Sequence, residues 1–108
     1  YETLGIMFPT KFPYGIQMES VIINDSELGN QQIQFITNDN ETYVFVEKNK
    51  RAPSTLDKDN TIYKKNDATY YIIQENIYFA FCYYEDDYYY IQANTYDALT
   101  LIIDNMKE

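Results

Sequence analysis

Residues 69–93 read TYYIIQENIYFAFCYYEDDYYYIQA. The stretch divides into three strand-like runs, 69–74, 77–84 and 88–93, with short polar turns at 75–76 and 85–87. β-branched and aromatic residues bounded by such turns are typical of antiparallel strands joined by hairpins. All three runs carry apolar residues on both faces, so we expect them to lie centrally in a sheet. One face should rest on the core, and the other should form a tyrosine-rich surface or groove.

Four further runs upstream predict the remaining strands: 16–23, 31–37, 42–47 and 61–65. The first three are joined by short polar connections, which favours a meander of neighbouring antiparallel strands. The polar segment 49–60, which contains Pro53, is the one substantial loop. Its length suggests either mobility or a crossing between two parts of the sheet.

Near the C-terminus the apolar period changes to that of an amphipathic helix, with a stripe formed by Leu99, Ile102, Ile103 and Met106. Thr95 is suited to cap the helix N-terminus, and Asp97 lies in the first turn, where a negative charge complements the helix dipole. Lys107 should lie at the opposite, favourable end of that dipole.

These elements predict a single α+β domain over residues 1–108. We expect a curved antiparallel sheet of six or seven strands with one C-terminal helix packed on one face. The aromatic content of 18% excludes the class of disordered chains.

The composition argues against most enzyme and cofactor chemistry. The chain contains 13 tyrosines and no histidine, so the side chain best suited to proton transfer near neutral pH is missing. It has only three glycines and no glycine-rich phosphate loop or G-x-S-x-G motif. Seventeen acidic against eight basic residues give a net charge of −9, which opposes binding to nucleic acid. We therefore expect no enzyme activity, no cofactor and no nucleic-acid partner.

Two acidic segments raise the question of a calcium site. The trio at 85–87, Glu85-Asp86-Asp87, falls where a polar hairpin turn is expected anyway. The segment 57–60 resembles the start of a calcium loop, but Ile62 and Ala68 stand where that loop requires glycine and glutamate. We expect no metal site in either segment.

The single Cys82 lies inside the apolar run 77–84, with only Glu85 and Asp86 as charged neighbours in sequence. A reactive thiol needs a cationic neighbour, so we expect a buried structural cysteine. The basic residues gather at 48–51 and at 64–65. We interpret them as loop and edge charges that protect exposed strands from pairing.

The tyrosines of the last three strands are the candidate interaction residues. Alternation places Tyr71 on one face of its strand, and Tyr78 shares a face with Tyr84. We predict that Tyr71, Tyr78, Tyr84 and Tyr89 contribute to a ligand or partner face, because tyrosine offers contact area at low entropic cost. The alternative is that these rings pack in the core and on the sheet.

Several short segments together resemble a known family: FPTKFPYG at 8–15, Ile33-Gln34-Phe35, Tyr89-Tyr90-Ile91 and IIDNM at 102–106. The order of these segments is similar to an uncharacterised extracytoplasmic domain of AT-rich Gram-positive bacteria. That domain sits at the C-termini of membrane-anchored, anti-sigma-factor-like proteins and of lipoproteins. Its architecture is similar to half of a lipoprotein-carrier-like sheet with a covering helix. This chain has the turn at 84–87 where the family carries an aromatic residue and a glycine.

The resemblance implies an extracytoplasmic location, at the cell surface or anchored to the membrane by a segment upstream of residue 1. It implies a protein or a cell-envelope component as partner, and no catalytic residues. The leading hypothesis is a non-catalytic sensing or protein-interaction domain, which a flat aromatic patch would favour. The alternative is a carrier-like module for an apolar, peptide or glycan ligand, which a helix-lidded cavity would favour. A small carboxylate-dependent hydrolase is the third hypothesis and requires converging carboxylates in a deep pocket.

Overall fold

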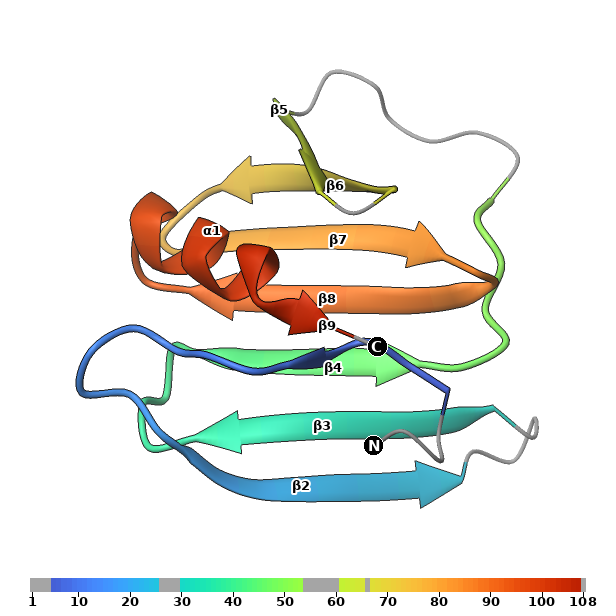
Figure 1. Cartoon of the computed structure of the whole chain (residues 1–108), viewed down its shortest axis with the longest axis horizontal. Helices are drawn as coiled ribbons and strands as arrows, with labels where there is room; N and C mark the ends of the chain where they lie inside the picture. The colour runs from blue at the N-terminus through green and yellow to red at the C-terminus, as the bar shows by residue number, and fades with distance from the viewer. Residues whose placement is uncertain (1–4, 26–29, 54–60, 66, 108) are drawn as a thin grey trace.

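A computed structural model describes residues 5–25, 30–53, 61–65 and 67–107 of the chain. Its main element is an open, seven-stranded antiparallel sheet in the order β2-β3-β4-β8-β7-β6-β5 (Figure 1). The strands are β2 (Met18–Asp25), β3 (Gln31–Thr37), β4 (Tyr43–Glu47), β5 (Thr61–Lys65), β6 (Ala68–Gln74), β7 (Tyr78–Tyr84) and β8 (Asp87–Ala93). The predicted α+β class, the seven strands and the single C-terminal helix are confirmed.

The chain builds this sheet in two antiparallel meanders. The first, β2-β3-β4, follows the short connections predicted for it, and the second, β5-β6-β7-β8, ends with β8 paired to β4. The link from β4 therefore runs from the middle of the sheet to its far edge, as the length of the loop at 49–60 indicated. Residues 54–60 of that link lie outside the described part of the chain.

Helix α1 (Tyr96–Asp104) forms where the apolar period changes, and it begins as predicted. The Thr95 side chain accepts a hydrogen bond from the backbone N–H of Ala98 at 3.0 Å, and Asp97 lies in the first turn. The helix ends earlier than expected, with Asn105 as its C-cap, so Met106 is not a helical residue and the last turn has no basic residue. The expected dipole role of Lys107 is thus wrong.

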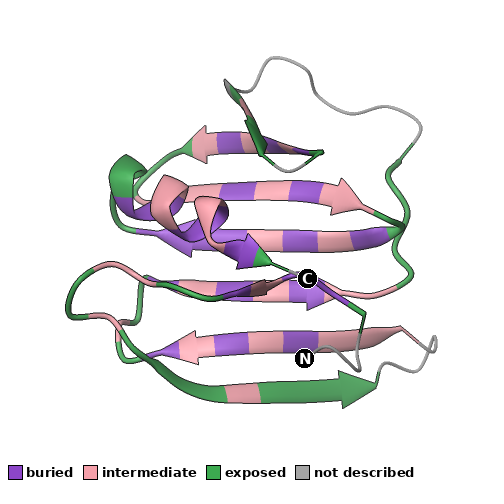
Figure 2. Cartoon of the chain, in the orientation of Figure 1, coloured by how far each residue is buried: buried purple, intermediate pink, exposed green. Residues whose placement is uncertain are grey.

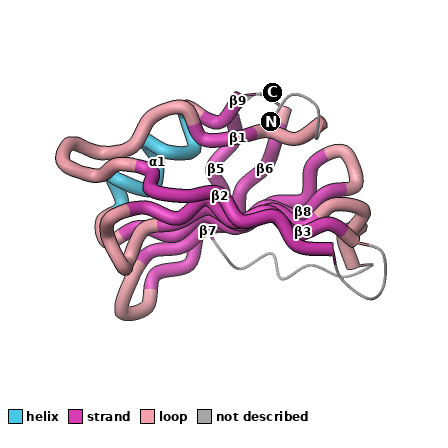
Figure 3. The backbone as a smooth tube through the Cα atoms, turned by 90° about the horizontal axis from the view of Figure 1, so that it is seen from below, coloured by secondary structure: helices cyan, strands magenta, loops and turns pink. Residues whose placement is uncertain are grey.

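The residues after the helix instead form a second, two-stranded sheet with the N-terminal segment. In it, β1 (Phe8–Pro9) pairs antiparallel with β9 (Met106–Lys107). The helix and this small sheet lie on the same side of the large sheet (Figure 3). The pairing was not foreseen, because it joins the two ends of the chain and two-residue strands carry no periodicity.

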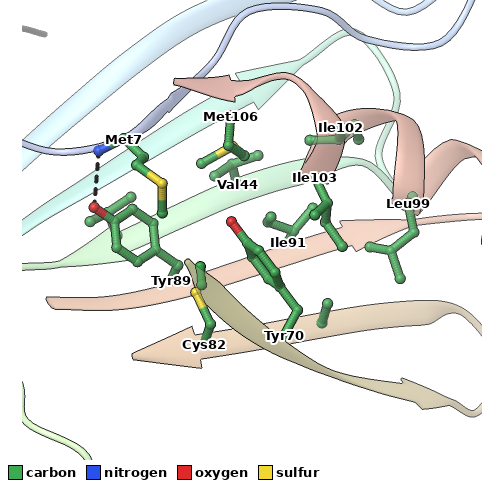
Figure 4. Packing of buried hydrophobic residues seen from close by; sticks show 14 of the residues in the cluster. Met7, Val44, Tyr70, Cys82, Tyr89, Ile91, Leu99, Ile102, Ile103 and Met106 are labelled. Carbon is green, nitrogen blue, oxygen red and sulfur yellow. Dashed lines mark hydrogen bonds between the residues drawn. The ribbon is translucent and has the colours of Figure 1, made fainter. Parts of the chain in front are cut away.

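The core fills the space between the large sheet and this cover. Alternate residues of the central strands point into it, as the banded burial in Figure 2 shows. Leu99, Ile102 and Ile103 of the helix meet Val44 and Ile91 of the sheet in one buried cluster (Figure 4). Since packed interiors tolerate few voids, this cluster determines how closely the helix approaches the sheet.

Cys82 is fully buried in this core, as predicted. Burial raises the pKa of its thiol to about 12, so the thiol stays protonated at neutral pH. A protonated, buried thiol is a packing group, because the thiolate is the reactive form.

The outer strand β5 is held to the helix by a hydrogen bond. The Tyr63 hydroxyl donates to Asp104 Oδ1 at 2.5 Å. This bond to a carboxylate, together with partial burial, raises the pKa of Tyr63 from 10.0 to about 12. The contact ties one edge of the sheet to the end of the helix.

We expect Ile103→Ala to lower the free energy of unfolding by about 2–5 kcal/mol, because it removes a fully buried side chain and leaves a cavity. Leu101→Ala is the matched control, since Leu101 lies on the same helix but is only partly buried. Chemical denaturation should show a clearly smaller decrease in the free energy of unfolding for Leu101→Ala than for Ile103→Ala. Equal losses in the two variants would contradict the docking of the helix through Ile103.

The Tyr63 contact should make stability depend on pH. Its pKa in the folded protein lies above the unfolded value of 10.0, so its contribution is complete below pH 10 and is lost as the pH rises towards 12. We expect the stability difference between the parent protein and Tyr63→Phe to shrink over this interval, as measured by denaturation at several pH values. A difference that stays constant would mean that the bond to Asp104 contributes nothing.

Candidate interaction surface

The face of the large sheet that points away from the helix carries a continuous set of aromatic side chains. We call it the open face and define it by Tyr43, Phe45, Tyr71, Phe79, Phe81, Tyr83, Tyr88 and Tyr90. Each ring alternates along its strand with residues that point into the core. In the described part of the chain, the elements outside the large sheet are the helix, β1 and β9, and all three lie on its other side.

One cross-strand row organises the middle of this face. Direct pairing across all seven strands places the following residues side by side, from one edge to the other: Ile62, Tyr71, Phe81, Tyr90, Phe45, Gln34 and Ile22. Cross-strand pairs of aromatic and β-branched residues stabilise antiparallel sheets. The row therefore contributes to the sheet and forms its surface at the same time.

Five of the eight rings of the open face form stacked pairs, and the other three make edge-on or tilted contacts. The ring centroids of Tyr71 and Phe81 lie 5.4 Å apart with an interplanar angle of 26°, and those of Phe79 and Tyr90 have the same values. Tyr43 and Tyr90 are 5.6 Å apart at 29°. Rings this close cannot lie flat side by side, so they overlap in offset stacks. Their faces partly cover each other, and all five rings remain partly exposed.

Polar groups sit at one side of this stack. Lys50 Nζ lies 4.9 Å from the ring centroid of Tyr88 and 3.7 Å from Glu47 Oε2. The Tyr90 hydroxyl donates to Gln92 Oε1 at 2.9 Å. Burial raises the pKa of Tyr88 and that of Tyr90, so both hydroxyls remain protonated donors at neutral pH.

A shallow hollow of about 310 Å³ lies over this side of the face, lined by Gln34, Tyr43, Phe45, Tyr88 and Tyr90. Aromatic walls with an amide at one end suit an apolar side chain that is accompanied by a backbone polar group. The open face is thus mostly apolar and also carries hydrogen-bonding groups.

The four tyrosines predicted as a partner face do not share one face. Tyr71 pairs with Phe81 and lies on the open face. Tyr78 and Tyr84 lie on the helix side and pack partly buried against the core. Tyr89 is only 1% exposed, and its hydroxyl accepts a hydrogen bond from the backbone N–H of Met7 at 2.9 Å (Figure 4). The prediction that these four tyrosines share one face is therefore wrong, because the pairing between strands places them on different faces. The alternation predicted within each strand is right.

The remaining rings of the open face were missed, yet the sequence carries a signal for them. Ala80 and Cys82 are small and lie under the helix side, where Cys82 pairs with Tyr89 and Ala80 with Ile91. Small residues opposite large ones fill a packed layer without voids. The small residues of β7 therefore mark its covered side, which leaves Phe79 and Phe81 for the open face.

A larger hollow lies elsewhere, beside the helix. It measures about 680 Å³ and is lined by Lys11, Phe12, Pro13, Tyr14, Thr95, Asp97, Ala98 and Leu101. Asp97 is the one carboxylate among these residues. The hollow beside the helix therefore lacks the pair of carboxylates that glycoside hydrolysis requires.

The acidic turn at 85–87 is used in local contacts. Asp87 is buried and accepts a hydrogen bond from the backbone N–H of Asn49 at 2.9 Å, and Asp86 lies 3.8 Å from Arg51. Within the described residues, no group of three or more cysteine or carboxylate side chains is placed to hold a metal ion. The second acidic segment, 57–60, lies outside the described residues.

Comparison with protein-family models, curated proteins and solved structures finds no significant match to this chain. No helix in the described residues is long and apolar enough to cross a membrane.

We expect Tyr89→Phe to destabilise the protein by about 1–3 kcal/mol, because it leaves the buried N–H of Met7 without this acceptor. Tyr71→Phe is the matched control on the open face and should change stability by no more than about 0.5 kcal/mol. Chemical denaturation of both variants measures the difference. If the two hydroxyls prove equally important, Tyr89 is not held in the core as described.

Proposed function

We propose that this chain is a non-catalytic protein-interaction domain that binds its partner through the open face. The observation that carries the proposal is the layer of eight aromatic rings, five of them in stacked pairs, on the side of the sheet that the helix leaves bare. Large exposed apolar patches on soluble proteins mark interaction sites. Tyrosine is enriched at such sites because it buries much area and retains a hydroxyl.

The stacking favours a protein partner over a glycan. A sugar ring packs on the exposed face of an aromatic ring, and here the faces of Tyr71, Phe81 and Tyr90 are turned towards neighbouring rings. Ring edges and hydroxyls remain for contact, and they suit the mixed apolar and hydrogen-bonding surface of a protein. The rings are already ordered by their neighbours, so binding costs little side-chain entropy.

The carrier and hydrolase alternatives receive less support. A carrier would hold its ligand between the helix and the sheet, but that space is filled by Leu99, Ile102 and Ile103. The hollow beside the helix is an open depression rather than an enclosed cavity, and Asp97 is its one carboxylate. The interaction proposal accounts for the aromatic open face, which the carrier and hydrolase hypotheses both leave unexplained.

The resemblance to an extracytoplasmic domain extends this proposal to a location. We infer a domain outside the cytoplasm, at the cell surface or membrane-anchored, whose partner is a protein or another component of the cell envelope. The net charge of −9 is compatible with this location, since it disfavours adsorption to anionic lipid.

Site-specific photo-crosslinking in the producing cells tests the proposal. A benzophenone side chain placed at Phe81 should give a defined protein adduct, identified by mass spectrometry, because Phe81 lies in the middle of the open face. Tyr14 is the matched control, since it is a fully exposed aromatic residue in the segment that lines the hollow beside the helix. The same substitution there should give no such adduct.

A second position on the open face distinguishes a true interface from a chance contact. A benzophenone at Tyr71 should yield the same adduct as Phe81, because the two residues are direct cross-strand neighbours. Adducts that arise equally from Tyr14, or their absence at both open-face positions in a protein that melts normally, would overturn the proposal.

A further inference from the structure

The edge strand β2 is unusually exposed for an apolar strand. Of its eight residues, Val21 alone is partly buried and the others are exposed (Figure 2). Ile22 is 38% and Ile23 is 49% exposed. In the described part of the chain, β2 pairs with β3 on one side and with no strand on the other. Such an edge presents a row of free backbone N–H and C=O groups next to apolar side chains.

The opposite edge of the same sheet is protected. Strand β5 carries Lys64 and Lys65, and Tyr63 ties it to Asp104 of the helix. Lysines on an edge strand discourage pairing with another chain. Strand β2 contains neither lysine nor proline. Its one irregularity is a register shift between Met18 and Ser20, which leaves residues 20–25 as a regular edge.

Side chains on both faces of β2 lack cover. Ile22 ends the cross-strand row of the open face, next to Gln34. Ile23 pairs with Ile33 and so points to the helix side, yet Ile33 is fully buried while Ile23 is half exposed. The cover formed by the helix, β1 and β9 thus leaves Ile23 about half exposed. An added strand with apolar residues opposite Val21 and Ile23 would complete this side of the core.

The acidic residues near this edge favour a partner strand that carries basic residues. Glu19 and Asp25 flank the apolar centre of β2, and the whole chain has a net charge of −9. An antiparallel second copy centred on Ile22 would bring Asp25 of one chain towards Glu19 of the other, which adds like-charge repulsion. A strand with basic residues at both ends would instead form favourable cross-strand pairs at these positions.

We propose that β2 is a docking site for an extended peptide segment with a β-branched apolar centre and a lysine or arginine at each end. The segment pairs antiparallel with residues 20–25 as an eighth strand. Backbone hydrogen bonds supply affinity, the apolar centre covers Ile23, and the basic ends meet Glu19 and Asp25. This edge is distinct from the centre of the open face, so either proposal can fail while the other holds.

Three synthetic peptides test the docking site on the intact chain. The probe is acetyl-KTVIVTK-amide, and the same peptide with glutamate at both ends reverses the charge. A third peptide keeps the lysines but carries N-methyl groups on the backbone amides that face β2, which blocks the ladder of hydrogen bonds. We expect the probe to bind and to protect amides of residues 20–25 from hydrogen exchange. The other two peptides should bind at least about tenfold more weakly.

Matched protein variants test whether the peptide binds at β2. Ile23→Lys should weaken binding of the probe about tenfold or more, because a lysine on an edge strand opposes pairing. Ile62→Lys is the control, since Ile62 is 50% exposed on the other edge strand β5, and binding should be unchanged. Asp25→Lys should weaken the probe and strengthen the glutamate peptide. Melting curves of all variants confirm that they fold.

Four results would overturn the proposal. Equal binding of the N-methylated peptide, or equal loss of binding in both isoleucine variants, would mean that the peptide adheres through charge alone. A dimer of the chain by itself in sedimentation equilibrium, with the amides of β2 protected, would mean that a second copy occupies the edge. Absence of binding by the probe in folded protein would contradict the site as well.

Discussion

Burial of one face of the sheet beneath a single short helix is the constraint on which the rest of the structure depends. Helix α1 has nine residues, and the sheet has seven strands. The helix therefore covers only part of one face, over β7 and β8 and towards one end of these strands, with β1 and β9 beside it (Figure 1). Leu99, Ile102 and Ile103 of the helix belong to this apolar cover, together with Ile6, Met7, Ala98 and Met106. The other face and the strand farthest from the helix must be stabilised in a different way.

Tyrosine and phenylalanine side chains stabilise the face that the helix does not cover. A bare sheet face needs side chains that pack on their cross-strand neighbours and still tolerate water. The stacks of Tyr71 on Phe81 and of Phe79 on Tyr90 bury ring faces against each other, and hydroxyls such as that of Tyr90 reach polar partners. The high tyrosine content is thus both a stabilising device and the chemistry of the proposed interface.

The two edges of the sheet are treated differently. Strand β5 has lysines and is tied to Asp104 through Tyr63, whereas β2 leaves Ile22 and Ile23 in contact with solvent. An exposed apolar edge is an aggregation hazard unless its charges or its partner prevent pairing. The acidic net charge opposes self-association, and the partner proposed for this edge is a basic segment.

By itself, the sequence determined the type and order of the main elements, because alternation, polar turns and the cap at Thr95 are local signals. It also determined which residues of one strand share a face. Only the tertiary structure decided which face became core, since Tyr88, Tyr89 and Tyr90 are identical in hydropathy. Tyr89 turned inward because Cys82 beside it is small and leaves room for the ring, and this depends on register between strands. The pairing of β1 with β9 and the uncovered edge of β2 likewise depend on the arrangement of residues that are distant in the sequence, which no local pattern encodes.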